Sequence, residues 1–468
     1  MGEREQGTLF EPKFNRAVRV EPATIELTED TGALALRTAA EQVGLVGALA
    51  RLRDPRRPDL LTHPMVELVL TRVFLIAQGW GDQDDADALR TDVAFRMAVS
   101  ERRGTRPLDP PRTLEPTGLA SQPTMSRMVD TLTYEPNLAL LPKVLLQVGM
   151  SRLADERLDR ELTLDVDSFP QVAHGHQEGA VYNGHYHETM LHPLAILAHT
   201  GDLLAVQQRP GNVHTAHEVR DLLAPVLQAV KPMVDSVWVR VDAGFASGSF
   251  FDWLDEREVQ WVTRLRTNAA LTRHCQGWAA RVRAWWRKHA DHDEPRTELY
   301  EFEYQAESWS RPRRVVAVMV ERDSHEGELF DRLFFLCTSA DAERADAAEI
   351  LGRYRQRGRA EAHIGEFVRE TRPSLSSTGL AHNQVNTLLA ALAYQLLHHI
   401  RQRLVDVTGE GLSLRRLRER VLKVATQVVR HARRVVFRIG HVKVEAWKLL
   451  SRALEPPVPA LQEGLPAN

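Results

Sequence analysis

The sequence lacks the features that mark secreted and membrane proteins. Its 468 residues include only two cysteines, Cys275 and Cys337, which excludes a disulfide framework and a zinc site built on several cysteines. No run of about 18 apolar residues is present, so we expect no segment to cross a membrane. The start of the chain is polar, without the apolar stretch of a secretory signal, and we therefore expect a cytoplasmic protein.

The charges nearly balance over the whole chain but not along it. The net charge of −3 at pH 7 does not by itself indicate a nucleic-acid partner. Residues 398–448, however, carry 13 lysines and arginines against four acidic residues, and such a region can bind phosphates. The apolar fraction of 43% is ample for globular folding, and the length predicts two to four domains or one core with insertions.

Aspartates follow two strand-like segments. Residues 161–168 alternate between apolar and polar side chains, as a strand does, and place Asp165 and Asp167 near the end of the segment. A second segment, 237–242, ends in Asp242 before a turn. An isolated Asp-x-Asp most often caps a loop. Two such strand ends favour a shared site instead, because a desolvated carboxylate needs a cation or a hydrogen-bond donor.

A third acidic residue follows on a predicted helix. Tyr354, Arg357 and Glu361 are spaced by three and four residues, so they share one helical face. Two aspartates at strand ends and one glutamate on a helix form a set of hard oxygen ligands. Such a set suits Mg²⁺ or Mn²⁺.

The order of predicted elements indicates a mixed α/β core with an insertion. Helices and strands alternate from residue 137 to 264, and the chain is helical again from residue 341. Between them, residues 269–339 combine a tryptophan-rich basic helix with strand-like segments, which predicts a β-rich insertion. Its tryptophans can stack on flipped bases, although burial in a core is the commoner role; they are Trp278, Trp285, Trp286 and Trp309.

Two further features leave alternatives open. Five histidines lie between residues 174 and 192, but their spacing matches no zinc site, so we expect a hairpin or loop that lines a polar groove. Residues 119–128 have the look of a turn that leads into the second helix of a helix-turn-helix. Plain packing of that helix is equally compatible with the pattern.

Four motifs together resemble a known family. They are Asp-Val-Asp-Ser at 165–168, Arg-Pro-Gly-Asn-Val-His at 209–214, Asp-Ala-Gly-Phe at 242–245, and Tyr354-x-x-Arg357-x-x-x-Glu361. Over roughly residues 60–440 the chain is similar to the DDE-type transposases of bacterial insertion sequences, within the group-1 DDE transposase domain. The resemblance implies a ribonuclease-H-like fold with Asp167, Asp242 and Glu361 as catalytic and metal-binding acids. Asp165 is the alternative for the first position.

The resemblance also implies a reaction and its partners. Water, activated by Mg²⁺ or Mn²⁺ in a two-ion site, would cut the transposon ends, and the freed 3′-hydroxyl would attack target DNA. A hairpin on the transposon end is an expected intermediate. The expected partners are double-stranded DNA of the terminal inverted repeats and of the target, bound by a homodimer in a synaptic complex, with no membrane.

Tyr354 and Arg357 are expected to hold a phosphate. One departure stands out, because related sequences carry a lysine seven residues after the glutamate and this chain has Val368 there. We assign that phosphate contact to the neighbouring Arg369.

This reading divides the chain into four parts. They are a helical N-terminal DNA-binding region at 1–134, a catalytic core at 135–268 and 340–404, the insertion at 269–339, and a basic helical C-terminal region at 405–468. Two alternatives share the motifs: a metal-dependent nuclease without strand transfer, and a domesticated DNA-binding protein with a degenerate site. The presence of all three acids argues against decay, and the insertion with its basic flanks favours a transposase over a simple nuclease.

Overall fold

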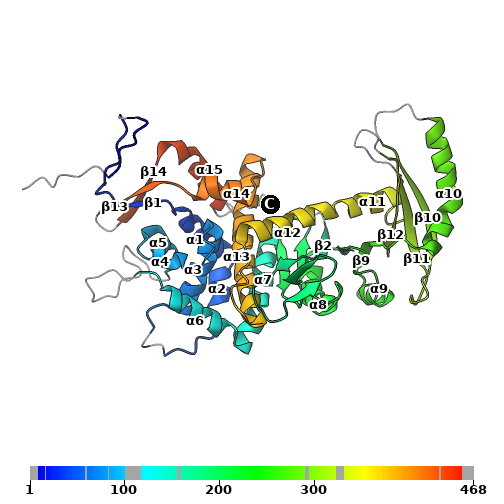
Figure 1. The fold of residues 1–468 in the computed structure, drawn as a ribbon, viewed down its shortest axis with the longest axis horizontal. Coiled ribbons are helices and arrows are strands. Elements are labelled where there is room, and N and C mark those ends of the chain that lie inside the picture. Colours follow the sequence, from blue (N-terminus) through cyan, green and yellow to red (C-terminus); the bar gives the residue numbers. More distant parts are fainter. Residues whose placement is uncertain are drawn as a thin grey trace, which may run out of the picture.

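The computed structural model shows an elongated molecule. It describes residues 9–455 apart from 16, 58, 60, 83, 101–117, 155, 157–159, 290–294, 323–330 and 432–433. The proline-rich linker expected at 107–116 and the chain after residue 455 lie outside this description. Figure 1 shows helices from both ends of the sequence at one end of the molecule, a sheet in the middle and the insertion at the other end. No helix in the described ranges is long and apolar enough to cross a membrane.

An eight-stranded sheet forms the centre, in the order β10-β11-β12-β9-β8-β2-β6-β7. Five strands form its core part: β2 (Glu161–Ser168), β6 (Leu194–Ala198), β7 (Leu203–Gln207), β8 (Ser236–Val241) and β9 (Gln260–Leu265). Strand β2 pairs antiparallel with β6 and parallel with β8, and β8 pairs parallel with β9. The ends of β2, β8 and β9 therefore meet at one edge of the sheet. The predicted ribonuclease-H-like mixed sheet is confirmed.

Helices flank this sheet. They are α7 (Glu135–Ala154), α8 (Val219–Val230) with the short 3₁₀ turn η2 (Lys231–Met233), and α9 (Gly248–Asp255). Helices α7, α8 and α13 (Leu380–Thr408) all contact β7. The apolar face of α8 is buried with the inward-facing residues of β2, β6 and β8, because both the helix and the strands leave their charged positions outside this core.

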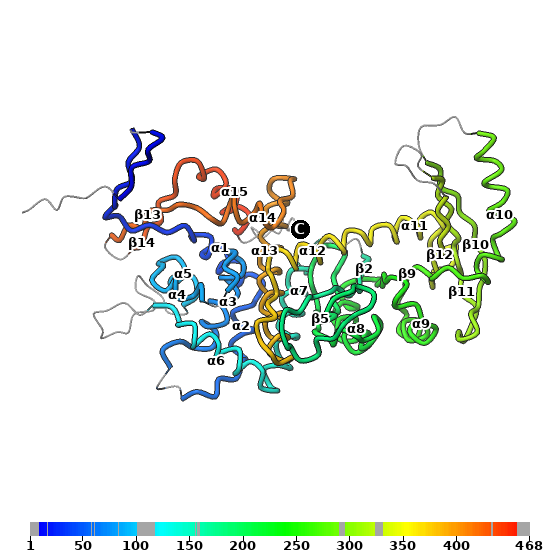
Figure 2. The backbone as a smooth tube through the Cα atoms, viewed as in Figure 1, coloured from blue at the N-terminus to red at the C-terminus, as the bar shows by residue number. Residues whose placement is uncertain are grey.

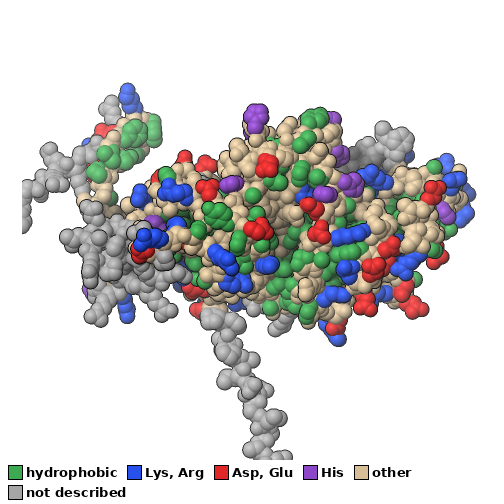
Figure 3. Space-filling model, turned by 90° about the horizontal axis from the view of Figure 1, so that it is seen from below, with side chains coloured by type: hydrophobic (Ala, Val, Ile, Leu, Met, Phe, Trp, Pro, Cys, Tyr) green, Lys and Arg blue, Asp and Glu red, His purple; other side chains and the backbone are tan. Residues whose placement is uncertain are grey.

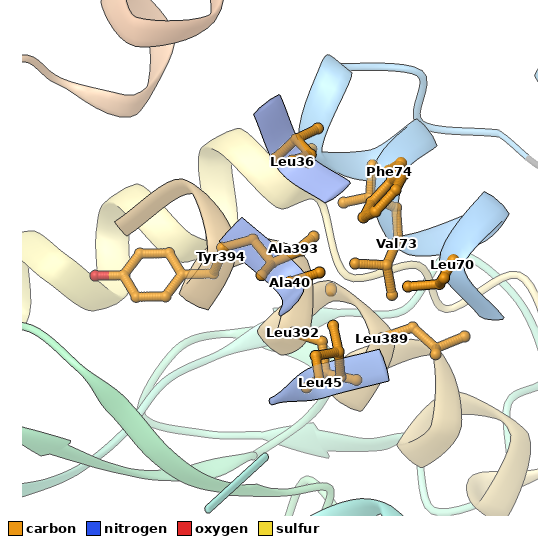
Figure 4. Packing of buried hydrophobic residues seen from close by; sticks show 14 of the residues in the cluster. Leu36, Ala40, Leu45, Leu70, Val73, Phe74, Leu389, Leu392, Ala393 and Tyr394 are labelled. Atoms are coloured by element: carbon orange, nitrogen blue, oxygen red, sulfur yellow. The ribbon is translucent and has the colours of Figure 1, made fainter. Parts of the chain in front are cut away.

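A second core unites the N-terminal helices with α13. The N-terminal helices are α1 (Gly32–Gln42), α2 (Leu45–Leu49), α3 (Met65–Gln78), α4 (Asp85–Ala88), α5 (Val93–Val99) and α6 (Gln122–Leu132). Helix α3 is buried along its whole length and crosses α13. Figure 4 shows this packing through Leu36 and Ala40 of α1, Leu70, Val73 and Phe74 of α3, and Leu389, Leu392 and Ala393 of α13.

Helix α6 is the segment for which a helix-turn-helix was considered. Its Met125, Met128 and Leu132 are buried in the second core, whereas Arg127 is exposed. The apolar face of α6 therefore serves packing. A DNA contact by Arg127 stays a prediction.

A small antiparallel sheet interrupts the connection from β2 to β6. It consists of β3 (Gln171–Val172), β4 (Val181–Asn183) and β5 (Glu188–Leu191), in the order β3-β5-β4. The segment with five histidines thus contains a hairpin, formed by β4 and β5. The local sequence pattern predicts one continuous strand over 190–197, and this prediction is wrong: Pro193 lacks the N–H needed to continue a ladder, and β5 and β6 belong to different sheets.

The insertion extends the central sheet. Its strands are β10 (Thr297–Tyr304), β11 (Arg313–Val320) and β12 (Arg332–Thr338), and β12 pairs antiparallel with β9. Helix α10 (Ala269–Lys288) packs on β10. Trp286 and Trp309 are buried and therefore serve the core of the insertion, whereas Trp285 is 47% exposed. Figure 2 shows α11 (Ala347–Arg355) and α12 (Arg357–Thr371) returning from the insertion to the centre.

The C-terminal region differs from the expectation of a helical segment. After α14 (Leu414–Leu417) and a π-helical turn (Arg418–Leu422), the chain forms β13 (Thr426–His431) and β14 (Arg434–Ile439), and then the 3₁₀ turn η4 (His441–Lys443) and α15 (Val444–Leu454). Strand β13 pairs with β1 (Leu27–Thr28) from the other end of the sequence. Valines favour strands, and a partner some 400 residues away supplied the pairing that local periodicity does not reveal.

The surface carries both signs of charge. On the face shown in Figure 3, lysine and arginine side chains are interspersed with aspartate and glutamate, and several histidines gather near the middle. This mixture agrees with the small net charge of the chain.

Candidate active site

The end of β2 presents two aspartates in different surroundings. Asp165 is 2% exposed and accepts hydrogen bonds from Nε and Nη2 of Arg240, at 2.5 and 2.7 Å. Arg240 lies opposite Asp165 on β8, so this bidentate pair follows from the register of the two strands. Asp167, whose side chain is 13% exposed, lies two residues further along β2, near the carboxyl end of the strand. Asp165 is thus held as a buried structural ion pair, and Asp167 is the carboxylate that faces the site.

Asp242 follows β8 at the same edge. Its Oδ1 accepts a hydrogen bond from the N–H of Gly244 at 2.8 Å, and its backbone oxygen accepts one from the hydroxyl of Thr263 at 3.0 Å. A Cβ on Gly244 would lie 3.0 Å from that Oδ1 and 3.2 Å from Thr215, so the close approach of two loops favours glycine here. The turn after β8 therefore holds the Asp242 carboxylate in a fixed direction.

Arg357 links Glu361 to Asp167 through two ion pairs. The expected single helix is divided at Gln356, so Tyr354 belongs to α11 and Arg357 begins α12. The backbone at Gln356 keeps helical angles, so the axis continues with little change. Arg357 donates from Nη2 to Oδ2 of Asp167 at 2.6 Å, and its Nη1 forms an ion pair with Glu361. One guanidinium thus joins the first and third acids.

The acidic cluster is short of positive charge. Burial, with a smaller contribution from the charges of Asp242 and Glu361, raises the pKa of Asp167 to about 7, against the opposing effects of Arg357 and the N–H of Ser168. Because these charges act on Asp167, all three carboxylates lie within electrostatic reach of one another. An additional cation would favour the ionised form of Asp167.

The donor set fits a hard divalent cation in its chemistry. In the described part of the chain, however, no three side chains of His, Cys, Asp or Glu converge closely enough to hold a metal ion as they stand. The guanidinium of Arg357 bridges Asp167 and Glu361. Metal binding by these acids therefore requires the Arg357 side chain to move. The described histidines likewise form no group that could hold a metal ion.

A cavity of about 430 Å³ opens beside the acids. It is lined by Asp242, Ala243, Arg264, Leu265, Arg266, Thr267, Tyr354 and Arg357. Burial raises the pKa of Tyr354, Arg357 and Arg264 lower it, and Asp242 raises it, which places the Tyr354 phenol among these groups. Arg264 and Arg266 were missed in the sequence analysis. The available signal was their place at the end of β9, the third parallel strand of this edge.

The cavity continues toward the insertion. A neighbouring hollow of about 200 Å³ shares Ala243, Leu265 and Arg266 with it and reaches Tyr304 and Trp309 at the base of the insertion. The insertion thus borders the acidic site.

Arg369 lies apart from the acids. It follows Glu361 by eight residues on α12, or about 12 Å along the helix axis. It lines a cavity of about 670 Å³ at the end of α12, together with Val368, Arg372, Arg415 and Arg418. Val368 packs against the second core. The role of Arg369 in phosphate binding stays a prediction.

Comparison with known proteins identifies a family. The family described as transposase DDE domain, group 1, matches residues 10–455. A comparison with curated proteins finds no match. Among solved structures, this chain is similar to a piggyBac transposase in a synaptic complex with hairpin DNA, with 11% sequence identity and a TM-score of 0.43; the match covers 92% of this chain and 83% of that chain.

Proposed function

This chain belongs to the group 1 family of transposase DDE domains, and from that premise we propose that it moves a DNA segment by cut-and-paste transposition. It would hydrolyse the phosphodiester at each transposon end and join the freed 3′-hydroxyl to target DNA. The observation that carries the proposal is the gathering of Asp167, Asp242 and Glu361 around one arginine at one edge of the sheet.

We assign Asp167, Asp242 and Glu361 as the ligands of Mg²⁺ or Mn²⁺, with two ions. When bound, such ions make an attacking oxygen more acidic and stabilise the charge on a leaving oxygen. The raised pKa of Asp167 supports this assignment, because a carboxyl that holds its proton near neutral pH without a cation will ionise when a cation binds.

Arg357 has a second role in this proposal. Its planar guanidinium now neutralises two carboxylates, and the same fork can bind two oxygens of a phosphate. If Asp167 and Glu361 held a divalent ion instead, Arg357 would be able to turn toward the cavity that it lines. Tyr354, Arg264 and Arg266 would hold the neighbouring phosphates of the same strand.

The DNA would extend along α12. Arg369, Arg372, Arg415 and Arg418 border the cavity at the end of this helix, and Arg369 and Arg372 lie about two and three turns beyond Glu361. Such a group of arginines can bind backbone phosphates without reading sequence. A homodimer is part of the proposal, because two transposon ends must be held together for concerted transfer.

A plasmid assay tests this function. The substrate is a supercoiled plasmid that carries both DNA segments flanking the coding region, incubated with the full chain and Mg²⁺, with a second plasmid as target. Excision followed by joining to the second plasmid supports transposition. Cleavage without joining would indicate a nuclease of the same fold, and binding without cleavage would indicate a domesticated DNA-binding protein. Either of these outcomes overturns the proposal.

A further inference from the structure

The hairpin between β4 and β5 lies beside the acidic site. In the pairing of β2 with β6, Asp167 is opposite Ala195, and the N–H of Phe169 donates to the backbone oxygen of Pro193 at 3.1 Å. His192, which ends the connection from β5, therefore lies just beyond the end of the strand that carries Asp167. The β4–β5 hairpin reaches the site through this connection.

A buried arginine fixes that connection. Arg209 is 0% exposed and donates from Nε to the backbone oxygen of His192 at 2.9 Å. Its Nη1 donates to the backbone oxygens of Thr215 at 2.9 Å and His217 at 2.6 Å. Arg209 is the first residue of the Arg-Pro-Gly-Asn-Val-His motif, so this part of the family pattern holds the hairpin connection against the loop before α8.

The glycine of the same motif fixes the hairpin itself. A Cβ on Gly211 would lie 2.0 Å from the backbone oxygen of Met190 and 2.7 Å from that of Val181, so only glycine allows this approach. The backbone oxygen of Gly211 accepts a hydrogen bond from Nδ2 of Asn183 at 2.7 Å. The motif therefore binds both strands of the hairpin.

The tip of the hairpin has a defined conformation. Oδ1 of Asn183 accepts hydrogen bonds from the N–H groups of His185 at 3.0 Å and Tyr186 at 3.4 Å. His187 closes the turn with a φ of 58°, in the left-handed region where a glycine or asparagine is more usual. These contacts fix the backbone of the turn that carries Tyr186.

Tyr186 lies on the hairpin beside His192, near the end of the strand that carries Asp167. Its ring stands edge-on to His192, with ring centroids 5.8 Å apart and planes at 68°. Burial raises the pKa of its phenol, and the charges of Asp167 and Asp242 raise it as well, so both carboxylates are within electrostatic reach. In the part of the chain that the structure describes, no hydrogen bond engages this hydroxyl.

His192 packs against the ring of Tyr186. It is 4% exposed, and neither ring nitrogen has a hydrogen-bond partner among the described residues. Burial and the charge of Arg209 lower its pKa, and the backbone of Val213 opposes them weakly without meeting the geometry of a hydrogen bond. His192 is therefore neutral and serves as an aromatic wall for Tyr186.

We propose that Tyr186 is a further catalytic residue, which donates a hydrogen bond from its hydroxyl to a non-bridging oxygen of the scissile phosphate, with His192 as its positioning residue. The inference rests on the proposed function. Negative charge is spread over these oxygens in the transition state of phosphoryl transfer, and a fixed donor in a site poor in water stabilises it. The phenol keeps its proton for this task because its acidic surroundings disfavour the phenolate.

Tyr186→Phe tests the hydroxyl alone. The matched control is Tyr182→Phe, which removes a hydroxyl from the same hairpin, where it lies 3.4 Å from Nδ1 of the His187 ring. Single-turnover cleavage of the supercoiled plasmid with Mg²⁺ is measured for both, together with DNA binding and thermal unfolding. We expect Tyr186→Phe to slow cleavage by about tenfold or more at unchanged binding and melting temperature, and Tyr182→Phe to stay within about twofold of the unsubstituted protein.

His192 is tested by rescue. His192→Ala removes the wall behind Tyr186 and is expected to slow cleavage, whereas His192→Phe keeps an aromatic ring of similar shape and is expected to restore it. Combining His192→Ala with Tyr186→Phe should slow cleavage no further than Tyr186→Phe alone, since both act through one hydroxyl. A fully additive loss would overturn the positioning role.

The outcomes separate this inference from the proposed function. If the unsubstituted protein cleaves and Tyr186→Phe cleaves equally fast, the inference is wrong and the proposed function stands. Equal losses in Tyr186→Phe and Tyr182→Phe also overturn it, because they would trace the effect to the hairpin fold. If the unsubstituted protein leaves the plasmid intact with both Mg²⁺ and Mn²⁺, the proposed function fails and this inference falls with it.

Discussion

Replacing Asp167 by asparagine should stabilise the metal-free protein at alkaline pH. The folded state raises the pKa of this carboxyl from 3.8 to about 7, so its ionisation is less favourable in the folded than in the unfolded chain. The contribution of Asp167 to the free energy of unfolding is therefore most favourable below about pH 4 and declines as the pH rises toward 7. A pKa difference of about 3 corresponds to about 4 kcal/mol. Arg357 loses its partner at 2.6 Å, which reduces the expected net gain to about 1–3 kcal/mol.

Asp165→Asn is the matched control, two residues away on the same strand. Burial raises the pKa of this carboxyl too, in spite of Arg240. Asparagine at position 165, however, leaves the guanidinium of Arg240, which is 1% exposed, without a charged partner. The substitution is therefore expected to destabilise the protein. Breaking such a buried pair costs about 3–5 kcal/mol. The two substitutions are therefore expected to change stability in opposite directions at pH 8.

Thermal unfolding from pH 5 to pH 8, in buffer with a chelator, measures both effects. The melting temperature of Asp167→Asn should exceed that of the unsubstituted protein by about 1–3 °C at pH 8, and the two should approach each other as the pH falls. Asp165→Asn should melt lower at every pH. If Asp167→Asn melts at or below the unsubstituted protein at pH 8, with no dependence on pH, the argument about a charge-deficient acidic cluster is refuted.

Three further expectations concern activity. Asp167→Asn, Asp242→Asn and Glu361→Gln should each abolish Mg²⁺-dependent plasmid cleavage and leave DNA binding within a few fold in a gel-shift assay; near-normal cleavage by any one would remove that residue from the site. Arg357→Lys keeps the charge but loses the planar fork, so cleavage should fall by about 10–100-fold in single-turnover assays, and an unchanged rate would exclude a bidentate phosphate contact. The affinity for DNA should fall steeply and linearly in a plot of log K against log salt, because several arginines displace counterions; a flat line would contradict broad phosphate contact.

The order of elements and the acidic motifs could be read from the sequence because both depend on local pattern. Alternation identifies β2 and β8, and each aspartate follows directly at a strand end. The spacing of Tyr354, Arg357 and Glu361 places them on one side of the α11–α12 segment. Parallel neighbouring strands then bring Asp167 and Asp242 to the same edge, which is a consequence of ribonuclease-H-like topology.

The sequence pattern alone could not distinguish Asp165 from Asp167 as the first acid of the site. Residues at i and i+2 of a strand lie on the same face, so periodicity treats the two aspartates alike. Only the register of β2 against β8 places Arg240 opposite Asp165, while Asp167 pairs with Arg357; this difference supports the proposal of Asp167 as the first acid. The arginines at the end of β9 and the strand pairing of β1 with β13 were equally hidden, because each depends on a partner far away in the sequence.

The sequence by itself determined the family and the mixed central sheet, and it led to the proposal of the three acids, since these follow from local alternation, helical spacing and motif. Only the tertiary structure decided which charges are neutralised and by what: Arg240 holds Asp165, Arg357 bridges Asp167 and Glu361, and the β4–β5 hairpin packs Tyr186 against His192. The physical reason is that electrostatic and hydrogen-bond partners are set by strand register and loop packing, which bring together residues distant in the chain.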